Sequence, residues 1–217
     1  MKKIAIILSG CGNRDGSELQ ETLSLMLALD RRDIAYQCFA PKGLFDVVSY
    51  LDGGETGEQR DIYAESARIA RGDIKPLSEY WDDDYAALAL PGGMGAARNL
   101  SSFAFDGASM KVDYLVEKAI LDTHAAHQPI LSMCIAPMVI ARVLGGFGVK
   151  VTLGKADCQQ ALIAKQFGAQ PVACEPTEIC VDELNRVITT PAYMVASHIS
   201  QIFDGADNMV AKLVEWL

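Results

Sequence analysis

The chain has 217 residues, of which 50% are hydrophobic and 22% charged, and this composition supplies enough apolar material for one globular core. The formal net charge of -9 argues against the basic surface that nucleic acid or an anionic membrane requires. No apolar run approaches the roughly 18 residues of a membrane span, so we expect neither nucleic acid nor a membrane as a partner.

The N-terminus places two lysines before a short apolar run, Ile4 to Leu8, which ends at Ser9-Gly10. A secretory signal needs an apolar region of ~7–15 residues, so a first buried strand is the better interpretation. The six cysteines include no C-x-x-C pair, and a chain of this length does not need disulfides. We therefore expect free thiols, a cytoplasmic location and a single domain over residues 1–217.

Apolar runs alternate with helical patterns along the chain. In order, the sequence predicts a strand at Lys3–Ser9, a helix from Glu18 capped by Asp15 or Ser17, a strand at Ile34–Ala40, a sheet extension at Asp46–Leu51, a turn at Gly53-Gly54 and a helix at Glu58–Arg71. There follow a strand at Tyr85–Leu90, a loop at Ser101–Gly107, a helix at Val112–Ala126, a strand at Ile130–Met133 and a helix at Pro137–Leu144. The pattern continues through Val149–Leu153, Ala161–Gly168, Pro171–Cys174 and Ile179–Val181 to a strand at Arg186–Thr190 and a helix at Ala196–Leu217, broken or bent near Gly205.

This alternation of strands and helices indicates βαβ units and a mainly parallel sheet. The strands are apolar throughout rather than alternating, which is typical of a sheet covered on both faces. Binding sites in such α/β folds lie at the carboxyl ends of the strands. Three strand ends are therefore candidates: Ser9–Gly12, Pro91–Gly95 and Cys134.

Cys134 follows one predicted strand and precedes a helix that begins with Pro137. This is the position of a nucleophile elbow, where a sharp strand-to-helix turn lifts a side chain above the sheet. A helix N-terminus stabilises negative charge, so we expect it to lower the pKa of the thiol. The alternative is a buried, inert cysteine, since cysteine is among the most buried residue types.

Two backbone features support this interpretation. Pro91-Gly92-Gly93 ends the preceding strand, and glycine N–H groups can face a developing oxyanion. We expect Gly93 and the N–H of Ile135 to form an oxyanion hole, with Gly92 beside them. A simple tight turn is the alternative for the glycines.

Glu18 stands at the start of the helix after the first strand. Its simplest role is that of a first-turn acid that complements the helix dipole. If the fold brings Glu18 beside Cys134, burial and a thiolate would both raise its pKa, and it could then exchange a proton with sulfur. Cys11, nearby in sequence, is either a second thiol of the site or a packing residue.

The histidines do not complete a hydrolase triad. Residue 135 is isoleucine, so no histidine follows Cys134, and the chain contains no His-x-Glu to supply one. We interpret His124 and His127 as surface residues and His198 as structural. The cysteines and histidines lack metal-ligand spacing, so we expect neither a metal nor an organic cofactor.

Several motifs together resemble one family. They are Ile7-Leu8-Ser9-Gly10-Cys11-Gly12, Asp15-Gly16-Ser17-Glu18, Pro91-Gly92-Gly93, Met133-Cys134-Ile135-Ala136-Pro137 and Thr189-Thr190-Pro191-Ala192-Tyr193-Met194. Over essentially the whole chain the sequence resembles the ElbB branch of the DJ-1/PfpI superfamily, within the class I glutamine amidotransferase-like fold. The resemblance implies a flavodoxin-like three-layer sandwich and a homodimer. It also implies that Cys134 is the elbow cysteine, that Glu18 is its partner carboxyl, and that Thr190 to Tyr193 border the pocket.

The resemblance further implies a link to isoprenoid biosynthesis and a glyoxalase activity that needs no glutathione. In that reaction the Cys134 thiolate attacks the aldehyde carbon of a small 2-oxoaldehyde, and Glu18 moves a proton through an enediol to give a 2-hydroxy acid. Two alternatives stay open. One is a redox or stress sensor whose reactive cysteine is oxidised, and the other is a binding protein with a vestigial site.

Overall fold

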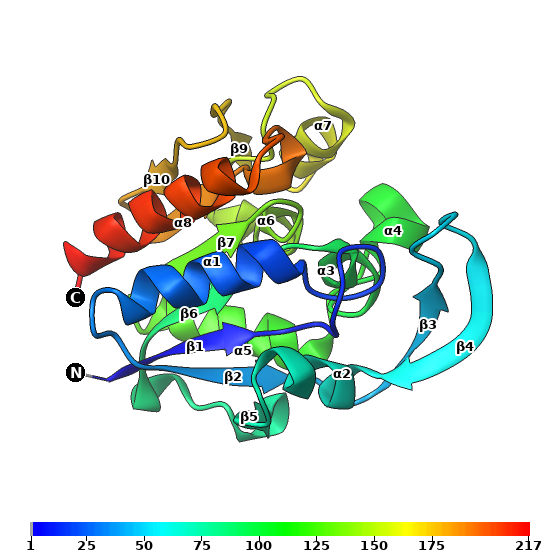
Figure 1. Cartoon of the computed structure of the whole chain (residues 1–217). Coiled ribbons are helices and arrows are strands. Elements are labelled where there is room, and N and C mark those ends of the chain that lie inside the picture. Colours follow the sequence, from blue (N-terminus) through cyan, green and yellow to red (C-terminus); the bar gives the residue numbers. More distant parts are fainter. Residues whose placement is uncertain (1) are drawn as a thin grey trace.

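The computed structural model describes residues 2–217, whose central feature is a seven-stranded sheet (Figure 1). Its strands are β1 (Lys3–Ile7), β2 (Tyr36–Ala40), β5 (Ile74–Pro76), β6 (Tyr85–Leu90), β7 (Ile130–Met133), β10 (Cys180–Asp182) and β11 (Val187–Thr190). They lie in the order β10-β11-β7-β6-β1-β2-β5, and every neighbouring pair is parallel except β10 with β11. The prediction of an α/β fold with a mainly parallel sheet is therefore confirmed.

Helices cover both faces of this sheet. Figure 1 shows α1 (Leu19–Asp30) and α8 (Ile199–Val214) side by side in front of it, with α5 (Tyr114–Ala125) and α6 (Pro137–Leu144) behind. The shorter helices are α2 (Ile62–Ile69), α3 (Met94–Arg98), α4 (Phe103–Asp106) and α7 (Gln159–Gln166). This arrangement of a sheet between two helical layers is the predicted flavodoxin-like sandwich.

The interior strands are apolar because they lie between these two layers. The residues of β6, β7 and β11 are buried along almost their whole length. Burial on both faces is what continuous apolar runs in parallel strands indicate. Within residues 2–217 no helix combines the length and the apolar content needed to cross a bilayer.

Two short strand pairs lie outside the main sheet and correct the sequence-based expectations. β3 (Leu44–Val48) pairs with β4 (Glu55–Asp61) in a separate hairpin, so the segment Asp46–Leu51 does not extend the sheet. Residues 58–61 belong to β4, and the helix expected from Glu58 begins only at Ile62. Its start is fixed because the Asp61 carboxylate accepts the Ala64 N–H at 2.7 Å. The second pair joins β8 (Lys150–Val151) to β9 (Gln170–Pro171).

Two further expectations about helices were wrong. The segment Ser101–Gly107, expected as a loop, contains the short helix α4. The last helix is neither broken nor bent near Gly205, because α8 continues from Ile199 to Val214. Gly205 instead permits close packing, since a Cβ there would lie 2.8 Å from Thr190 Oγ1.

Candidate active site

The carboxyl ends of β1, β6 and β7 meet at one edge of the sheet, where backbone hydrogen bonds join the segments that follow them. The Glu18 N–H donates to Gly92 O at 2.9 Å, and the Met94 N–H donates to Asn13 O at 2.8 Å. These bonds hold the first turn of α1 against the end of β6. Because β6 pairs with β7, the same turn lies beside Cys134.

Cys134 occupies a strained turn between β7 and α6. Its φ angle is 58°, in the left-handed region that residues other than glycine seldom adopt. The turn is held because the Cys134 N–H donates to Thr190 O at 3.0 Å, and because Pro137 starts α6 with the backbone angle a helix needs. This is the geometry of the nucleophile elbow that the sequence predicts.

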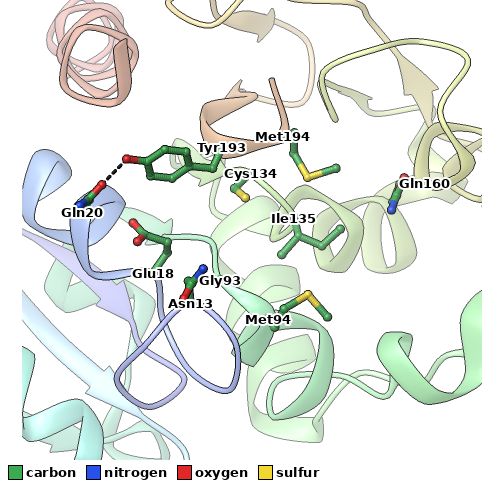
Figure 2. Close-up of a pocket in the computed structure, with 10 residues that line it drawn as sticks. All are labelled: Asn13, Glu18, Gln20, Gly93, Met94, Cys134, Ile135, Gln160, Tyr193 and Met194. Carbon is green, nitrogen blue, oxygen red and sulfur yellow. Dashed lines mark hydrogen bonds between the residues drawn. The ribbon is translucent and has the colours of Figure 1, made fainter. Parts of the chain in front are cut away.

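Figure 2 shows the pocket into which Cys134 opens. The pocket has a volume of about 540 Å³ and is lined by Asn13, Glu18, Gln20, Gly93, Met94, Cys134, Ile135, Gln160, Tyr193 and Met194. Cys134 is only 8% exposed as a residue, so it lies at the base of the pocket rather than at its mouth. Most residues singled out in the sequence thus line one cavity, whereas Gly92 and Thr190 lie outside its lining.

The carboxyl group that contacts the cysteine belongs to Glu21, which the sequence reasoning missed. The Glu21 carboxyl group lies beside the Cys134 side chain, because a Cβ built on Gly92 would lie 2.4 Å from both Glu21 Oε2 and Cys134 Cβ, and each group shifts the pKa of the other. Glu21 is fully buried; its Oε2 accepts the Gly92 N–H at 3.1 Å and its Oε1 accepts the Tyr193 N–H at 3.3 Å. Two backbone donors from distant segments therefore hold this carboxyl group against the thiol.

Glu18 lies one helical turn before Glu21 and has a different position. It is the N-cap of α1, in place of the expected Asp15 or Ser17, and its Oε2 accepts the Glu21 N–H at 2.6 Å. Its carboxyl group faces the pocket (Figure 2), and partial burial raises its pKa. The structure thus places Glu21 where the sequence analysis placed Glu18, and leaves Glu18 as a cap on the wall of the pocket.

Two backbone N–H groups lie near the Cys134 sulfur and lower its pKa. They belong to Gly93 and Ile135, the two donors expected from the sequence to form an oxyanion hole. Gly92 does not contribute to them, because its N–H is bonded to Glu21. Donors aimed at one point can stabilise negative charge on sulfur or on an oxygen attached beside it.

The titration of the pair differs from the sequence-based expectation. The pKa of Cys134 lies well above its ordinary value of 9.0, first because the thiol is buried and next because the Glu21 charge lies beside it. The N–H groups of Gly93, before α3, and of Ile135, before α6, lower this pKa but do not offset burial, so the expected depression by the helix N-terminus was wrong. Burial, followed by the charge of Glu18, raises the pKa of Glu21 to about 8. The pair therefore loses its first proton from Glu21 near pH 8, while the thiol of Cys134 keeps its own.

Thr190 and Tyr193 support the site from the C-terminal part of the chain. Thr190 is buried behind Cys134, where its carbonyl holds the elbow and its hydroxyl donates to Glu178 O at 3.1 Å. It does not border the pocket, contrary to the expectation. Tyr193 does so, and its hydroxyl is hydrogen-bonded to Gln20 Oε1 across one side of the pocket (Figure 2).

The other candidate groups lie elsewhere. Among the described residues that line the pocket there is no histidine, and His124 Nε2 lies 3.2 Å from Asn185 Oδ1 instead. Cys11 is half-buried and is not part of the lining. Over residues 2–217 no three histidine, cysteine or acidic side chains gather in a group able to hold a metal ion.

The substitution Gly92→Ala should disrupt the pair. A Cβ at this position would lie 2.4 Å from Cys134 Cβ and 2.4 Å from Glu21 Oε2, so the elbow or α1 must move. We expect a loss of about 1–3 kcal/mol in the free energy of unfolding, measured by urea denaturation. Gly146→Ala is the matched control because a Cβ there meets nothing within 4 Å. Equal stabilities of the two variants would contradict the packing at Gly92.

The raised pKa of Glu21 should make the fold less stable as the pH rises. The unfolded carboxyl group ionises near its ordinary pKa of 4.5, whereas the folded group keeps its proton up to about pH 8. Stability is therefore complete below pH 4.5 and is lost between pH 4.5 and 8, by on the order of 5 kcal/mol in total. Urea denaturation at several pH values should show this loss in the wild type and a much smaller one in Glu21→Gln. Parallel stability curves for the two proteins would exclude it.

No protein-family model matches the chain. Among curated proteins, it is 39% identical to the human glutamine amidotransferase-like class 1 domain-containing protein 3, mitochondrial, over 98% of the chain and 82% of that protein. It is 38% identical to the rat ES1 protein homolog, mitochondrial, over 98% and 83%. Because these relatives are named as mitochondrial proteins, they contradict the predicted cytoplasmic location, which the short N-terminal run did not suffice to establish.

Solved structures extend the comparison. An isoprenoid biosynthesis protein with an amidotransferase-like domain from Ehrlichia chaffeensis superposes with a TM-score of 0.91 and 33% identity, over 99% of this chain and all of that one. A DJ-1 superfamily protein from Salmonella typhimurium, with 22% identity, a TM-score of 0.61 and coverage of 99% and 91%, shares the fold. With relatives of 38–39% identity aligned over nearly its full length, the chain belongs to the family of glutamine amidotransferase-like class 1 domain proteins that includes the ES1 proteins.

Proposed function

We propose that the chain is a glyoxalase-type enzyme that converts small 2-oxoaldehydes, such as methylglyoxal and glyoxal, to 2-hydroxy acids without glutathione. The observation that carries the proposal is the packing of Cys134 against the fully buried carboxyl group of Glu21 at the base of an open pocket. A buried carboxyl group with a pKa of about 8 is suited to exchange a proton with a thiol near neutral pH.

The first step is attack by sulfur. Once Glu21 is ionised, its carboxylate accepts the Cys134 thiol proton as sulfur attacks the aldehyde carbon to give a hemithioacetal. The negative charge moves from sulfur to the former aldehyde oxygen, within reach of the Gly93 and Ile135 N–H groups that point to this place. The proton held by Glu21 then neutralises that oxygen, and no external cofactor takes part.

The second step moves a proton between two carbons of the bound substrate. Glu21 lies behind the cysteine, whereas the carboxyl group of Glu18 faces the pocket and keeps one oxygen free of the helix cap. Glu18 accepts the proton from the former aldehyde carbon and delivers it to the neighbouring keto oxygen, which gives an enediol. It then accepts the hydroxyl proton of the first oxygen and delivers it to the neighbouring carbon, which yields a thioester. Water then hydrolyses the thioester, so that the sum is one 2-oxoaldehyde and one water to one 2-hydroxy acid. The two carboxyl groups thus have separate roles, Glu21 at sulfur and Glu18 at the substrate carbons, because their environments differ.

The two other functions have weaker support in the site. Oxidation by peroxide follows thiolate character and exposure, whereas Cys134 is buried and its pKa is raised, which does not favour a sensor. A vestigial binding site would not need a buried carboxyl group, whose desolvation is costly, held against a thiol by two backbone donors.

The assay that tests the proposal uses purified protein, methylglyoxal and a metal chelator, without glutathione, in D₂O. We expect lactate that carries deuterium at its second carbon, because the enediol route passes the proton through a carboxyl group that exchanges with solvent. Heat-denatured protein is the control. Absence of lactate over the background would refute the proposed function, and lactate without deuterium would refute the enediol step while keeping the activity.

The finer placement in the ElbB branch, and with it a link to isoprenoid biosynthesis, is part of the same proposal. Its support is the similarity to the Ehrlichia chaffeensis protein, which is named an isoprenoid biosynthesis protein. The homodimer implied by the family resemblance stays a prediction that sedimentation analysis would test.

A further inference from the structure

The lining of the pocket has a marked charge composition. Its polar groups are three amides, from Asn13, Gln20 and Gln160, and the hydroxyl of Tyr193. Among the described residues that line it there is no lysine, arginine or histidine, and Glu18 is the one acidic group on the wall. An anion that entered would find no cation to pair with.

Electrostatics inside the pocket disfavour an anion further. Glu18 is half-buried, so water screens its charge less than it would at an open surface. In its singly protonated form, the Cys134–Glu21 pair adds a second negative charge at the base. A substrate with a phosphate or carboxylate would therefore lose its hydration and be repelled by these charges, so the pocket should bind it poorly.

The pocket is larger than a molecule of methylglyoxal requires. A volume of about 540 Å³ lies in the range of pockets that enclose drug-sized ligands, whereas methylglyoxal has only three carbons. Amide and phenol groups line part of the free volume, beside the apolar Met94, Ile135 and Met194, and they offer both the donors and the acceptors that hydroxyl groups need. Unfilled volume beyond the aldehyde thus has the chemistry of a subsite for a short polyol chain.

We propose that this pocket selects uncharged, hydroxyl-bearing 2-oxoaldehydes larger than methylglyoxal, and that Glu18 rejects their anionic counterparts. The inference rests on the proposed function in treating these aldehydes as substrates, whereas the charge selectivity is a property of the pocket itself. It can therefore be tested both by turnover and by chemistry that needs no turnover.

The turnover test compares matched aldehydes. Hydroxypyruvaldehyde should have a kcat/KM at least tenfold higher than hydroxypyruvaldehyde phosphate, which differs from it by the phosphate alone. 3-Deoxyglucosone, an uncharged sugar-derived 2-oxoaldehyde, should have a several-fold lower KM than methylglyoxal. Equal or faster turnover of the phosphate would overturn the charge selectivity, and a KM for 3-deoxyglucosone no lower than that of methylglyoxal would overturn the hydroxyl subsite.

The second test uses alkylation of Cys134 by uncharged iodoacetamide and by anionic iodoacetate, followed by mass spectrometry of the Cys134 peptide. In both reactions sulfur displaces iodide from the same carbon, so the ratio of the two rates, divided by the ratio for the unfolded protein, reports the charge of the pocket. We expect the folded wild type to prefer iodoacetamide at least tenfold more than the unfolded chain does.

Three variants assign this preference to Glu18. Glu18→Gln should reduce it several-fold, Glu18→Asp should keep most of it, and Glu117→Gln should leave it unchanged because Glu117 is exposed on α5. Thermal unfolding of each variant checks that loss of the helix cap has not opened the fold. A ratio that Glu18→Gln does not change, or no reaction of Cys134 with iodoacetamide, would overturn the inference.

The two tests separate failure of the function from failure of the inference. A strong preference for iodoacetamide with no turnover of any aldehyde would support the charge selectivity and refute the proposed glyoxalase. Equal turnover of hydroxypyruvaldehyde and its phosphate would support the proposed glyoxalase and refute the charge selectivity.

Discussion

Replacing Cys134 with alanine is expected to lower kcat/KM for methylglyoxal by ~10³-fold or more, since removal of a nucleophile eliminates the covalent route. The pocket, the Glu21 carboxyl and the Gly93 N–H stay in place, so substrate still binds without forming a hemithioacetal. The measurement is lactate formation under glutathione-free conditions, with thermal unfolding to show that the fold is retained. Alanine removes a single buried atom, so a change in stability of about 1 kcal/mol is expected.

Two control variants show whether this loss of activity is specific to the Cys134 thiol. Cys134→Ser keeps an atom able to hydrogen-bond Glu21 but replaces the thiol by a poor nucleophile, so it should be as inactive as alanine. Cys11→Ala removes the nearby half-exposed thiol that does not line the pocket, and it should keep the wild-type rate. Full activity of Cys134→Ala would remove the cysteine from the mechanism altogether.

Glu21→Gln should lower kcat/KM by ~10²–10⁴-fold, which is the usual contribution of a positioned acid–base group. An amide can still accept the Gly92 N–H through its oxygen, but it cannot take the thiol proton. The variant should therefore react more slowly with iodoacetamide at Cys134 as well. In the wild type, the rate of that alkylation should rise with pH as the pair loses its first proton near pH 8, and the substitution should remove this step.

Glu18→Gln is the comparison that separates the two carboxyl groups. It should also slow turnover, because the proton transfer between carbons is lost, but it should leave alkylation of Cys134 by iodoacetamide close to the wild-type rate. If Glu18→Gln and Glu21→Gln slow alkylation equally, the division of roles between the two carboxyl groups is wrong.

The parts of the fold that the sequence predicts well are those bounded by strong local signals. The predicted strands Tyr85–Leu90 and Ile130–Met133 and the predicted helix Pro137–Leu144 have the observed bounds. Each is an apolar run that ends at a glycine or proline or begins with one. By contrast, the helix expected from Glu58 begins at Ile62, because the polar residues before it form an exposed hairpin strand whose partner lies earlier in the chain. Such pairing depends on tertiary contacts that local spacing does not reveal.

Within the site, the position of Cys134 is predictable, but its partner is not. The spacing of Leu19, Leu23 and Leu27 along α1 suggests an apolar face, yet all three are exposed. The buried face instead carries Glu21 together with Leu25 and Ala28, at spacings of four and seven residues. An acidic residue in register with that second apolar row is the signal that would have identified Glu21. The raised thiol pKa was also beyond prediction, since burial of the sulfur depends on how three strand ends pack.

The hydrogen bonds from Tyr193 to the first turn of α1 have a consequence for the protein during its synthesis. The carboxyl group beside the nucleophile needs the Tyr193 N–H, and the backbone of the elbow needs the Thr190 carbonyl. Both residues follow Cys134 in the chain, so they leave the ribosome after it. A nascent or truncated polypeptide that stops before Thr190 therefore contains the cysteine but neither of these supports, and the reactive pair is assembled only after residues 190–193 have been synthesised.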